Sequence, residues 1–135
     1  AALKSYEKAL AIKHEYPGAH NNLGNILLDL GSLDSAVDHF EWAVAFKPDY
    51  AEAHNNLGVV ERHQEKFDQA IKSFEKAIAI QPNYVQAHSN LGNTLQDIGQ
   101  LDAAMTCYEN ALAINPDHSE ALKGFQRLLK YQHNL

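Results

Sequence analysis

Amide and imidazole side chains recur along the sequence at intervals of 34 residues. The amide series is Asn22, Asn56 and Asn90, and the imidazole series is His20, His54 and His88. An amide offers both a hydrogen-bond donor and an acceptor, which suits the backbone of an extended peptide. Neutral imidazole is a common metal ligand. The spacing therefore raises two candidate chemistries, peptide binding and metal binding.

The metal interpretation fails on distance. Ligands of one zinc ion must each lie about 2.0–2.1 Å from it. Equivalent residues of successive units are separated by at least one helix spacing, roughly 8–10 Å, so the three histidines cannot share an ion. We expect no metal and no cofactor. We interpret each imidazole as part of the packing between two helices, with its free nitrogen hydrogen-bonded locally.

A catalytic interpretation can be drawn from the charged residues around position 62. His63 stands beside Glu61 and Arg62, and Asp97 would lie near it across units. The sequence supplies no nucleophile, no oxyanion donors and no closed pocket to accompany them. We therefore expect no enzymatic activity and interpret these charges as a groove wall of mixed sign. The basic end of that wall would be formed by Lys123 and Arg127.

The 34-residue interval covers the whole chain. Asn-Leu-Gly recurs at residues 22–24, 56–58 and 90–92, and proline recurs at positions 48, 82 and 116. These registers divide residues 1–135 into one array, made of a second half-unit (1–16), three complete units (17–50, 51–84 and 85–118) and a first half-unit or capping helix (119–135). Such arrays offer extended surfaces more often than active sites.

Each unit shows the apolar spacing of a helix twice, which predicts a helical hairpin. A short acceptor followed three residues later by Glu or Gln predicts a capping box at the start of each first helix. The three acceptors are Asp49, Asn83 and Asp117. Gly31 and Gly99 mark the turn within a hairpin, because glycine readily takes the left-handed conformation. Glu65 stands at that place in the middle unit, and we expect its turn to be less stable by up to about 1 kcal/mol if φ is positive.

Small residues stand at fixed places in the units, with glycine at 24, 58 and 92 and alanine at 36, 70 and 104 and at 43, 77 and 111. Aromatic rings fill the space between helices at Phe40, Phe74 and Tyr108. This pattern resembles the tetratricopeptide repeat, W-x2-L-G-x2-Y…A-x3-F…P, which has the same period. The sequence departs from it at the Trp position, which holds histidine, and at the Tyr position, which holds Leu27, Glu61 and Leu95.

The resemblance implies an all-α, right-handed superhelical solenoid of antiparallel helical hairpins, with about seven to eight helices. It implies a protein-interaction scaffold that binds an extended peptide or a partner helix in its concave groove. The Asn-rich unit starts, such as A-E-A-H-N-N-L-G, are similar to the superhelical arm of O-linked N-acetylglucosamine transferase and to bacterial arrays. In those proteins an asparagine ladder binds peptide backbone.

Peptide-binding residues are expected along the concave face of the first helices. Asn22, Asn25 and Asp29 are spaced i, i+3 and i+7 on one helix face, which supports that placement. The expected set is Asn21, Asn22, Asn25, Asn55, Asn56, Arg62, His63, Asn90, Asn93, Asp97, Lys123 and Arg127. In the alternative interpretation, the asparagines bridge adjacent helices or solvate the groove. A clamp for acidic chaperone tails would need basic residues at places that hold Asn or Gln, so we do not expect that partner.

The charge balance limits the classes of partner. There are 11 Lys+Arg against 17 Asp+Glu, a net charge of −6, and no basic cluster, so we expect neither nucleic acid nor a membrane surface as a partner. Cys107 is the single cysteine, which excludes an internal disulfide. We find no transmembrane segment or signal peptide in the sequence. The chain opens within a unit and without an initiator Met, so we expect a piece of a longer protein and leave its localisation open.

Two further features suggest contacts with other molecules. The half-units at the two ends are complementary, which suggests head-to-tail self-association through the terminal helices. Trp42 replaces Lys76 and Asn110 of the other units, and it either contacts a partner or folds over Asp38 and Phe46 of its own helix. Besides a peptide-binding scaffold, the sequence thus leaves two alternatives open: a recognition arm of a larger enzyme, such as a glycosyltransferase, and a self-assembling architectural array.

Overall fold

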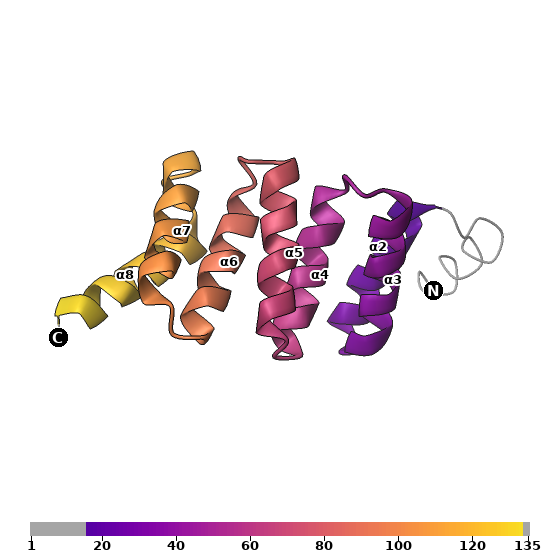
Figure 1. Cartoon of the computed structure of the whole chain (residues 1–135), viewed down its shortest axis with the longest axis horizontal. Helices are drawn as coiled ribbons and strands as arrows, with labels where there is room; N and C mark the ends of the chain where they lie inside the picture. Colours follow the sequence, from indigo (N-terminus) through magenta and orange to yellow (C-terminus); the bar gives the residue numbers. More distant parts are fainter. Residues whose placement is uncertain (1–15, 134–135) are drawn as a thin grey trace.

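The computed structural model describes residues 16–133 and contains, within that range, seven α-helices and no strand (Figure 1). The helices are α2 (Pro17–Asp29), α3 (Leu33–Phe46), α4 (Ala51–His63), α5 (Phe67–Ile80), α6 (Val85–Asp97), α7 (Leu101–Ile114) and α8 (Ser119–His133). The expected all-α solenoid of helical hairpins is confirmed. The second helix expected in the first half-unit lies outside the described residues. No helix of residues 16–133 combines the length and the apolar character needed to cross a membrane.

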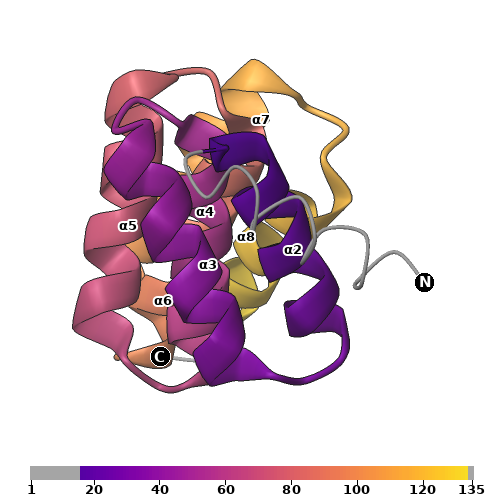
Figure 2. The ribbon, with the colours of Figure 1, turned by 90° about the vertical axis from the view of Figure 1, so that its right-hand side faces the viewer.

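The array curves because its two layers of helices are packed differently. Among the described helices, each first helix contacts the next one along the array, in the pairs α2–α4, α4–α6 and α6–α8. The second helices α3, α5 and α7 contact first helices but not one another. In the end-on view, α3 and α5 lie on one side and α2 and α8 on the other (Figure 2). The closely spaced first helices therefore line the concave face, and the separated second helices form the convex face.

The closest contact within each hairpin brings a glycine of the first helix against an aromatic ring of the second. A β-carbon placed on Gly24 would lie 2.6 Å from Cε1 of Phe40, and one placed on Gly58 would lie 2.6 Å from Cε1 of Phe74. Any side chain at these glycines would overlap a ring that is fully buried. The small residues therefore set the distance between the helices, as their regular spacing predicts.

The core continues from one unit into the next. The buried cluster around Tyr108 includes Phe74 from the preceding unit and Leu128 from α8. Another cluster joins Phe40 to Leu57 of the following unit. Because each aromatic ring contacts both its own hairpin and the next one, no unit has a complete core by itself.

The capping boxes predicted for α4 and α6 are wrong. The residue that precedes α4 is Tyr50 and the residue that precedes α6 is Tyr84, and neither helix start has a side-chain cap hydrogen bond. The amide of Tyr50 donates to the carbonyl oxygen of Lys47 at 3.1 Å, which closes a tight turn before the helix. This turn places Asp49 one residue too early to cap α4.

The turns inside the hairpins need a left-handed residue, and one of them lacks glycine. Gly31 and Gly99 both have φ of 80°, whereas Glu65 has φ of 61°. Glu65 is the single non-glycine residue with positive φ among the described residues. Glu65 therefore has the positive φ for which a less stable turn was expected.

We expect Glu65→Gly to raise the free energy of unfolding by up to about 1 kcal/mol, because glycine takes positive φ without steric cost. Glu65→Ala removes the same carboxylate but keeps the strained conformation, so it should give no comparable gain. Urea denaturation with an unchanged dependence on urea concentration measures the difference. Equal stability of the glycine and alanine variants would contradict the argument.

Candidate binding groove

Asparagine side chains join the first helices on the concave side. Asn56 Nδ2 donates to Asn21 Oδ1 at 3.0 Å, and Asn21 Nδ2 donates to Glu52 Oε1 at 3.3 Å. The hydroxyl of Tyr50 also shares a hydrogen bond with Asn21, and burial is the main reason that the pKa of Tyr50 is raised. Buried Asn21 is therefore the centre of a polar contact between α2 and the start of α4.

The same contact is repeated one unit further along. Asn90 Nδ2 donates to Asn55 Oδ1 at 3.0 Å, and the hydroxyl of Tyr84 bonds Asn55 as Tyr50 bonds Asn21. Burial again raises the pKa of the tyrosine. We call each of these asparagine pairs, Asn21–Asn56 and Asn55–Asn90, an amide rung. The rungs are the arrangement described by the alternative interpretation, in which asparagines bridge adjacent helices.

The third step of the array has no amide rung. By the repeat, Ser89 takes the place of Asn55, Gly124 that of Asn90 and His118 that of Tyr84. Glycine has no side chain to donate. Ser89 Oγ and His118 Nε2 are both buried without a hydrogen-bond partner within residues 16–133. The last helix, α8, is therefore attached without the polar contact that joins the earlier units.

The ring of Tyr108 leaves no room for a side chain that could form the third rung. Tyr108 replaces the phenylalanine of the other units, and a β-carbon on Gly124 would lie 2.4 Å from its Cζ atom. The hydroxyl donates to Asn93 Oδ1 at 2.5 Å and lies 3.1 Å from Gln96 Oε1. The side chain that would supply the third rung has no room beside this ring.

Four of the expected site residues meet near the C-terminal end of the concave face. Arg62 binds Asp97 through two hydrogen bonds, with Nε 2.6 Å from Oδ2 and Nη2 3.3 Å from Oδ1. Arg127 Nη2 donates to Gln96 Oε1 at 3.3 Å. Together with Asn93, the fourth expected residue, these side chains line a pocket of about 310 Å³. We call it the arginine pocket, and its residues come from α4, α6 and α8.

The other expected site residues are placed less uniformly. Asn21 and Asn55 are buried, whereas Asn25, Asn56 and Asn90 are half-buried. The exposed ones are Asn22, His63 and Lys123. A peptide therefore has access to part of the predicted ladder, and the binding role of all these residues stays a prediction.

Glutamine and glutamate side chains complete the polar wall, and they were not among the expected site residues. Gln86 Nε2 donates to Asn90 Oδ1 and to Glu120 Oε2, both at 2.9 Å. Glu52, Gln86 and Glu120 stand at the same place in successive units. That shared register is the signal by which sequence reasoning would have found them.

Comparison with known proteins supports the repeat architecture. The sequence profile described as tetratricopeptide repeat matches residues 49–117, and a related TPR repeat profile matches residues 1–31 and 24–61. The chain belongs to the tetratricopeptide repeat family. Repeats of this family generally serve as non-catalytic protein-interaction scaffolds, and the chain has the architecture of such a scaffold. Among curated proteins, none matches.

Solved tetratricopeptide repeat structures share the fold at low sequence identity. A crystal structure of MamA protein is 24% identical, with a TM-score of 0.88 over 97% of this chain and 72% of that chain. The first TPR of Spaghetti (RPAP3), bound to the HSP90 peptide SRMEEVD, is 21% identical, with a TM-score of 0.84 over 87% and 93%. The Arabidopsis OM64 TPR domain is 21% identical, with a TM-score of 0.83 over 85% and 95%.

The histidines at the family's Trp position have the packing role that was predicted. His54 and His88 are buried, and their Nε2 atoms lie 2.9 Å and 2.8 Å from the carbonyl oxygens of Pro48 and Pro82. Each imidazole thereby ties its helix to the loop that precedes it. No group of three or more potential metal ligands comes together within residues 16–133.

Trp42 is packed on one side and open on the other. Its ring stacks on His20 with centroids 5.1 Å apart and lies against Phe46 at 5.4 Å. It keeps 45% of its surface exposed. The structure therefore contains part of the expected folding over its own helix, and contact with a partner stays a prediction.

Two titratable groups lie between helices and away from the groove. Glu61, at the family's Tyr position, accepts a hydrogen bond of 2.6 Å from Ser73 Oγ. Burial raises the pKa of Glu61, although the Ser73 hydrogen bond acts in the opposite direction. Burial, with the nearby charge of Glu75, raises the pKa of the Cys107 thiol to about 11. Cys107 is therefore held as a neutral thiol at physiological pH.

The amide rung predicts a difference between equivalent positions of two units. Asn55→Ala should lower the free energy of unfolding by about 1–3 kcal/mol, because Asn90 and Tyr84 lose a buried hydrogen-bond partner. Ser89→Ala is the matched control and should be neutral or stabilising, because Ser89 Oγ has no partner within the described residues. Chemical denaturation measures both. Equal losses would show that the rung contributes nothing beyond side-chain volume.

Glu61 predicts a specific pH dependence. The folded protein binds the Glu61 proton more tightly than the unfolded chain, so its stabilising contribution is present at low pH and is lost as pH rises through the folded pKa. Glu61→Gln keeps an acceptor for Ser73 and removes the titration. The difference in free energy of unfolding between Glu61→Gln and the wild type should increase, in favour of the variant, from about pH 4 upward. Glu109→Gln, an exposed change on α7, is the control, and a constant difference for Glu61→Gln would refute the cause given.

Proposed function

We propose that this protein is a scaffold that binds an extended peptide of a partner protein along its concave face and has no catalytic activity of its own. The arginine pocket carries this proposal. Its polar side chains come from three successive first helices. A single extended chain lying across those helices contacts all of them at once, whereas a compact ligand meets an open wall.

The amide rungs leave hydrogen-bonding capacity for such a peptide. Each asparagine amide has two donor hydrogens and an acceptor oxygen with two lone pairs. Asn56 uses Nδ2 in its rung, and no described contact occupies its Oδ1. Asn93 accepts from Tyr108 and keeps its Nδ2. These half-buried amides supply both an acceptor and a donor for peptide backbone, while the buried Asn21 and Asn55 serve the rungs.

The arginine pocket adds a preference for an acidic side chain. Asp97 neutralises Arg62, but the described partners of Arg127 are the uncharged amide oxygen of Gln96 and the hydroxyl of Tyr108. Two guanidinium groups therefore face one carboxylate across the pocket. A carboxylate of the peptide completes the charge balance, because arginine binds carboxylates through paired, charge-assisted hydrogen bonds. The same contact orients the peptide along the groove.

The two alternatives of the sequence analysis use the same surfaces differently. In a recognition arm of a larger enzyme, the concave face would hold the substrate protein. In a self-assembling array, α8 would dock on the N-terminal half-unit of another copy, and the exposed Leu129 and Tyr131 on α8 favour that contact. Most of the opposite half-unit lies outside the described residues. Only the first alternative requires a peptide in the groove.

Fluorescence anisotropy with two labelled pools of twelve-residue peptides tests the proposal, one pool rich in Glu and one rich in Lys. We expect the Glu-rich pool to bind and Arg127→Gln to weaken it about tenfold, or about 1.4 kcal/mol. Asn56→Ala should weaken any pool that binds, because it removes a backbone contact.

The control is Lys66→Gln, an exposed change just before α5 that removes the same charge outside the proposed site and should leave the affinity unchanged. The proposal fails if neither pool binds, or if Arg127→Gln and Asn56→Ala both leave the affinity at the wild-type value.

A further inference from the structure

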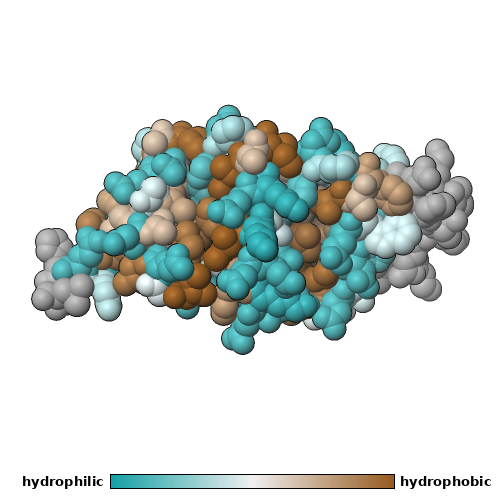
Figure 3. All heavy atoms as spheres, viewed as in Figure 1, coloured by the Kyte–Doolittle hydropathy of each residue, from teal (hydrophilic) through white to brown (hydrophobic). Residues whose placement is uncertain are grey.

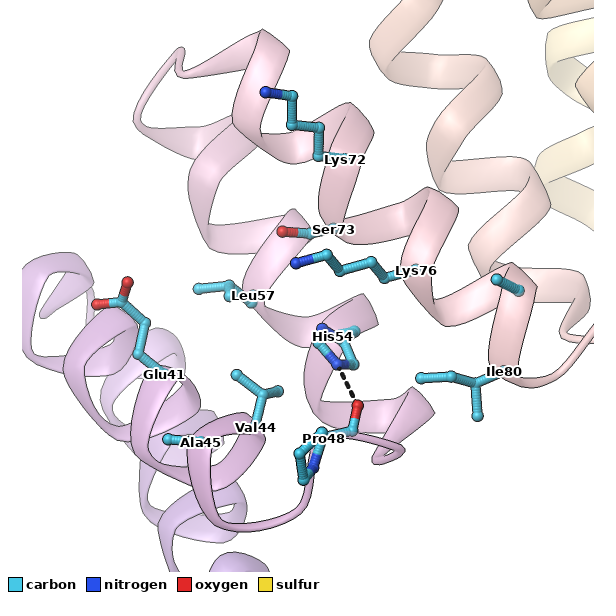
Figure 4. Close-up of a pocket in the computed structure, with 11 residues that line it drawn as sticks. Glu41, Val44, Ala45, Pro48, His54, Leu57, Lys72, Ser73, Lys76 and Ile80 are labelled. Atoms are coloured by element: carbon cyan, nitrogen blue, oxygen red, sulfur yellow. Dashed lines mark hydrogen bonds between the residues drawn. The ribbon is translucent and has the colours of Figure 1, made fainter.

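A second groove lies on the convex face between α3 and α5. Both helices pack on α4 and not on each other, so the space between them is open above α4. Figure 4 shows side chains from both walls and from α4 around this space. The cavity has a volume of about 620 Å³, within the range of ligand-binding pockets. Figure 3 shows the convex face, where apolar surface lies between the polar ridges of the second helices.

The groove is apolar at one end and charged at the other. Val44, Ala45 and Ile80 line it near the C-terminal ends of α3 and α5, above Leu57 of α4. The opposite end carries charged side chains from both walls: Glu41 from α3, and Lys72 and Lys76 from α5. Lys72 and Lys76 are four residues apart, so their ammonium groups lie one helical turn apart on one wall.

The next groove of the array shows which of these residues the repeat itself requires. At the places of Val44, Ala45 and Ile80, the following unit holds the similar residues Ile78, Ala79 and Ile114. At the places of Lys72 and Lys76 it holds Thr106 and Asn110. The apolar end is thus a property of every unit. Among the three complete units, both lysines occur only on α5, and the first half-unit carries lysine at the equivalent positions 4 and 8.

The charged end favours an anionic group. Its groove-lining charges are two ammonium groups against the carboxylate of Glu41. Glu61 lies behind Ser73, which donates to it; burial raises the pKa of Glu61, and the nearby charge of Lys76 acts in the opposite direction. Within residues 16–133 neither lysine forms a salt bridge. The lysines are therefore available to carboxylates of a partner.

We propose that this groove is a second binding site, which takes a short amphipathic helix of a partner protein. The partner helix places apolar side chains over Leu57 and two carboxylates, one turn apart, beside Lys72 and Lys76. The walls run for about two helical turns, from Glu41 to Pro48 and from Lys72 to Ile80, or roughly 10–12 Å. A helix suits this length because its apolar and acidic residues share one face at i, i+3, i+4 and i+7.

The site is separate from the proposed peptide site, since it lies on the second helices rather than the first. The scaffold would thus hold one partner on each face. Binding on one face does not require the other, so each proposal can fail independently.

A labelled fourteen-residue helical peptide tests the site, with leucines on one face and two glutamates one turn apart at one end of that face. Its matched control carries lysines in place of the glutamates. We expect the Glu peptide to bind at least tenfold more tightly than the Lys peptide in fluorescence anisotropy.

The decisive variant is the double change Lys72→Thr and Lys76→Asn, which copies the residues of the next unit and so is compatible with the fold. It should reduce binding of the Glu peptide at least tenfold, while Arg127→Gln leaves it unchanged. Equal affinity for the Glu and Lys peptides, or full affinity in the double variant, would overturn the proposal. Loss of binding in Arg127→Gln alone would assign the peptide to the concave face instead.

Discussion

The contact between a helix glycine and an aromatic ring underlies the rest of the structure. Gly24 and Gly58 let the rings of Phe40 and Phe74 lie directly against the backbone of the first helix. Because each ring also reaches the next unit, this one contact sets both the width of a hairpin and the step between hairpins. The close spacing of first helices on the concave side follows from it. Only at that spacing can amides of successive units bond each other directly.

The third unit shows how one side chain changes that pattern. The ring of Tyr108 occupies the space beside Gly124 of α8, and its hydroxyl donates to Asn93 and lies near Gln96. Gly124 then replaces the amide donor, and the third rung is absent. Gln96 instead accepts from Arg127, which joins α8 to α6. The arginine pocket therefore arises where the regular repeat is interrupted. The arginine pocket occurs once in the described part of the array and the amide rungs repeat, so the pocket is more informative about binding than the rungs are.

Much of the fold could be predicted from the sequence, because the 34-residue register reports packing directly. Helix number, the glycine and aromatic contacts, the histidine packing and the positive φ required at Glu65 all follow from comparing units. The first residue of each helix could not be predicted, because a shift of one residue in the preceding turn decides which side chain stands directly before the helix. Bridging asparagines were one of the two interpretations, but the partners within each rung could not be predicted, because Asn56 bonds Asn21 rather than its equivalent Asn22. The 34-residue register identifies equivalent residues of successive units, but it does not show which residue of the neighbouring unit each one contacts.

The same comparison separates structural from functional residues on both faces. A residue type that returns in every unit is explained by packing, as the apolar end of each convex groove is. Arg127 on the concave side has no basic counterpart in the complete units, and the pair Lys72 and Lys76 on the convex side is repeated only in the first half-unit, at positions 4 and 8. Long basic side chains at half-open sites contribute little to folding stability, because solvent screens their interactions. Their placement beside two separate hollows is therefore better explained by ligands than by the fold, and the solenoid supplies a rigid spacing between the two.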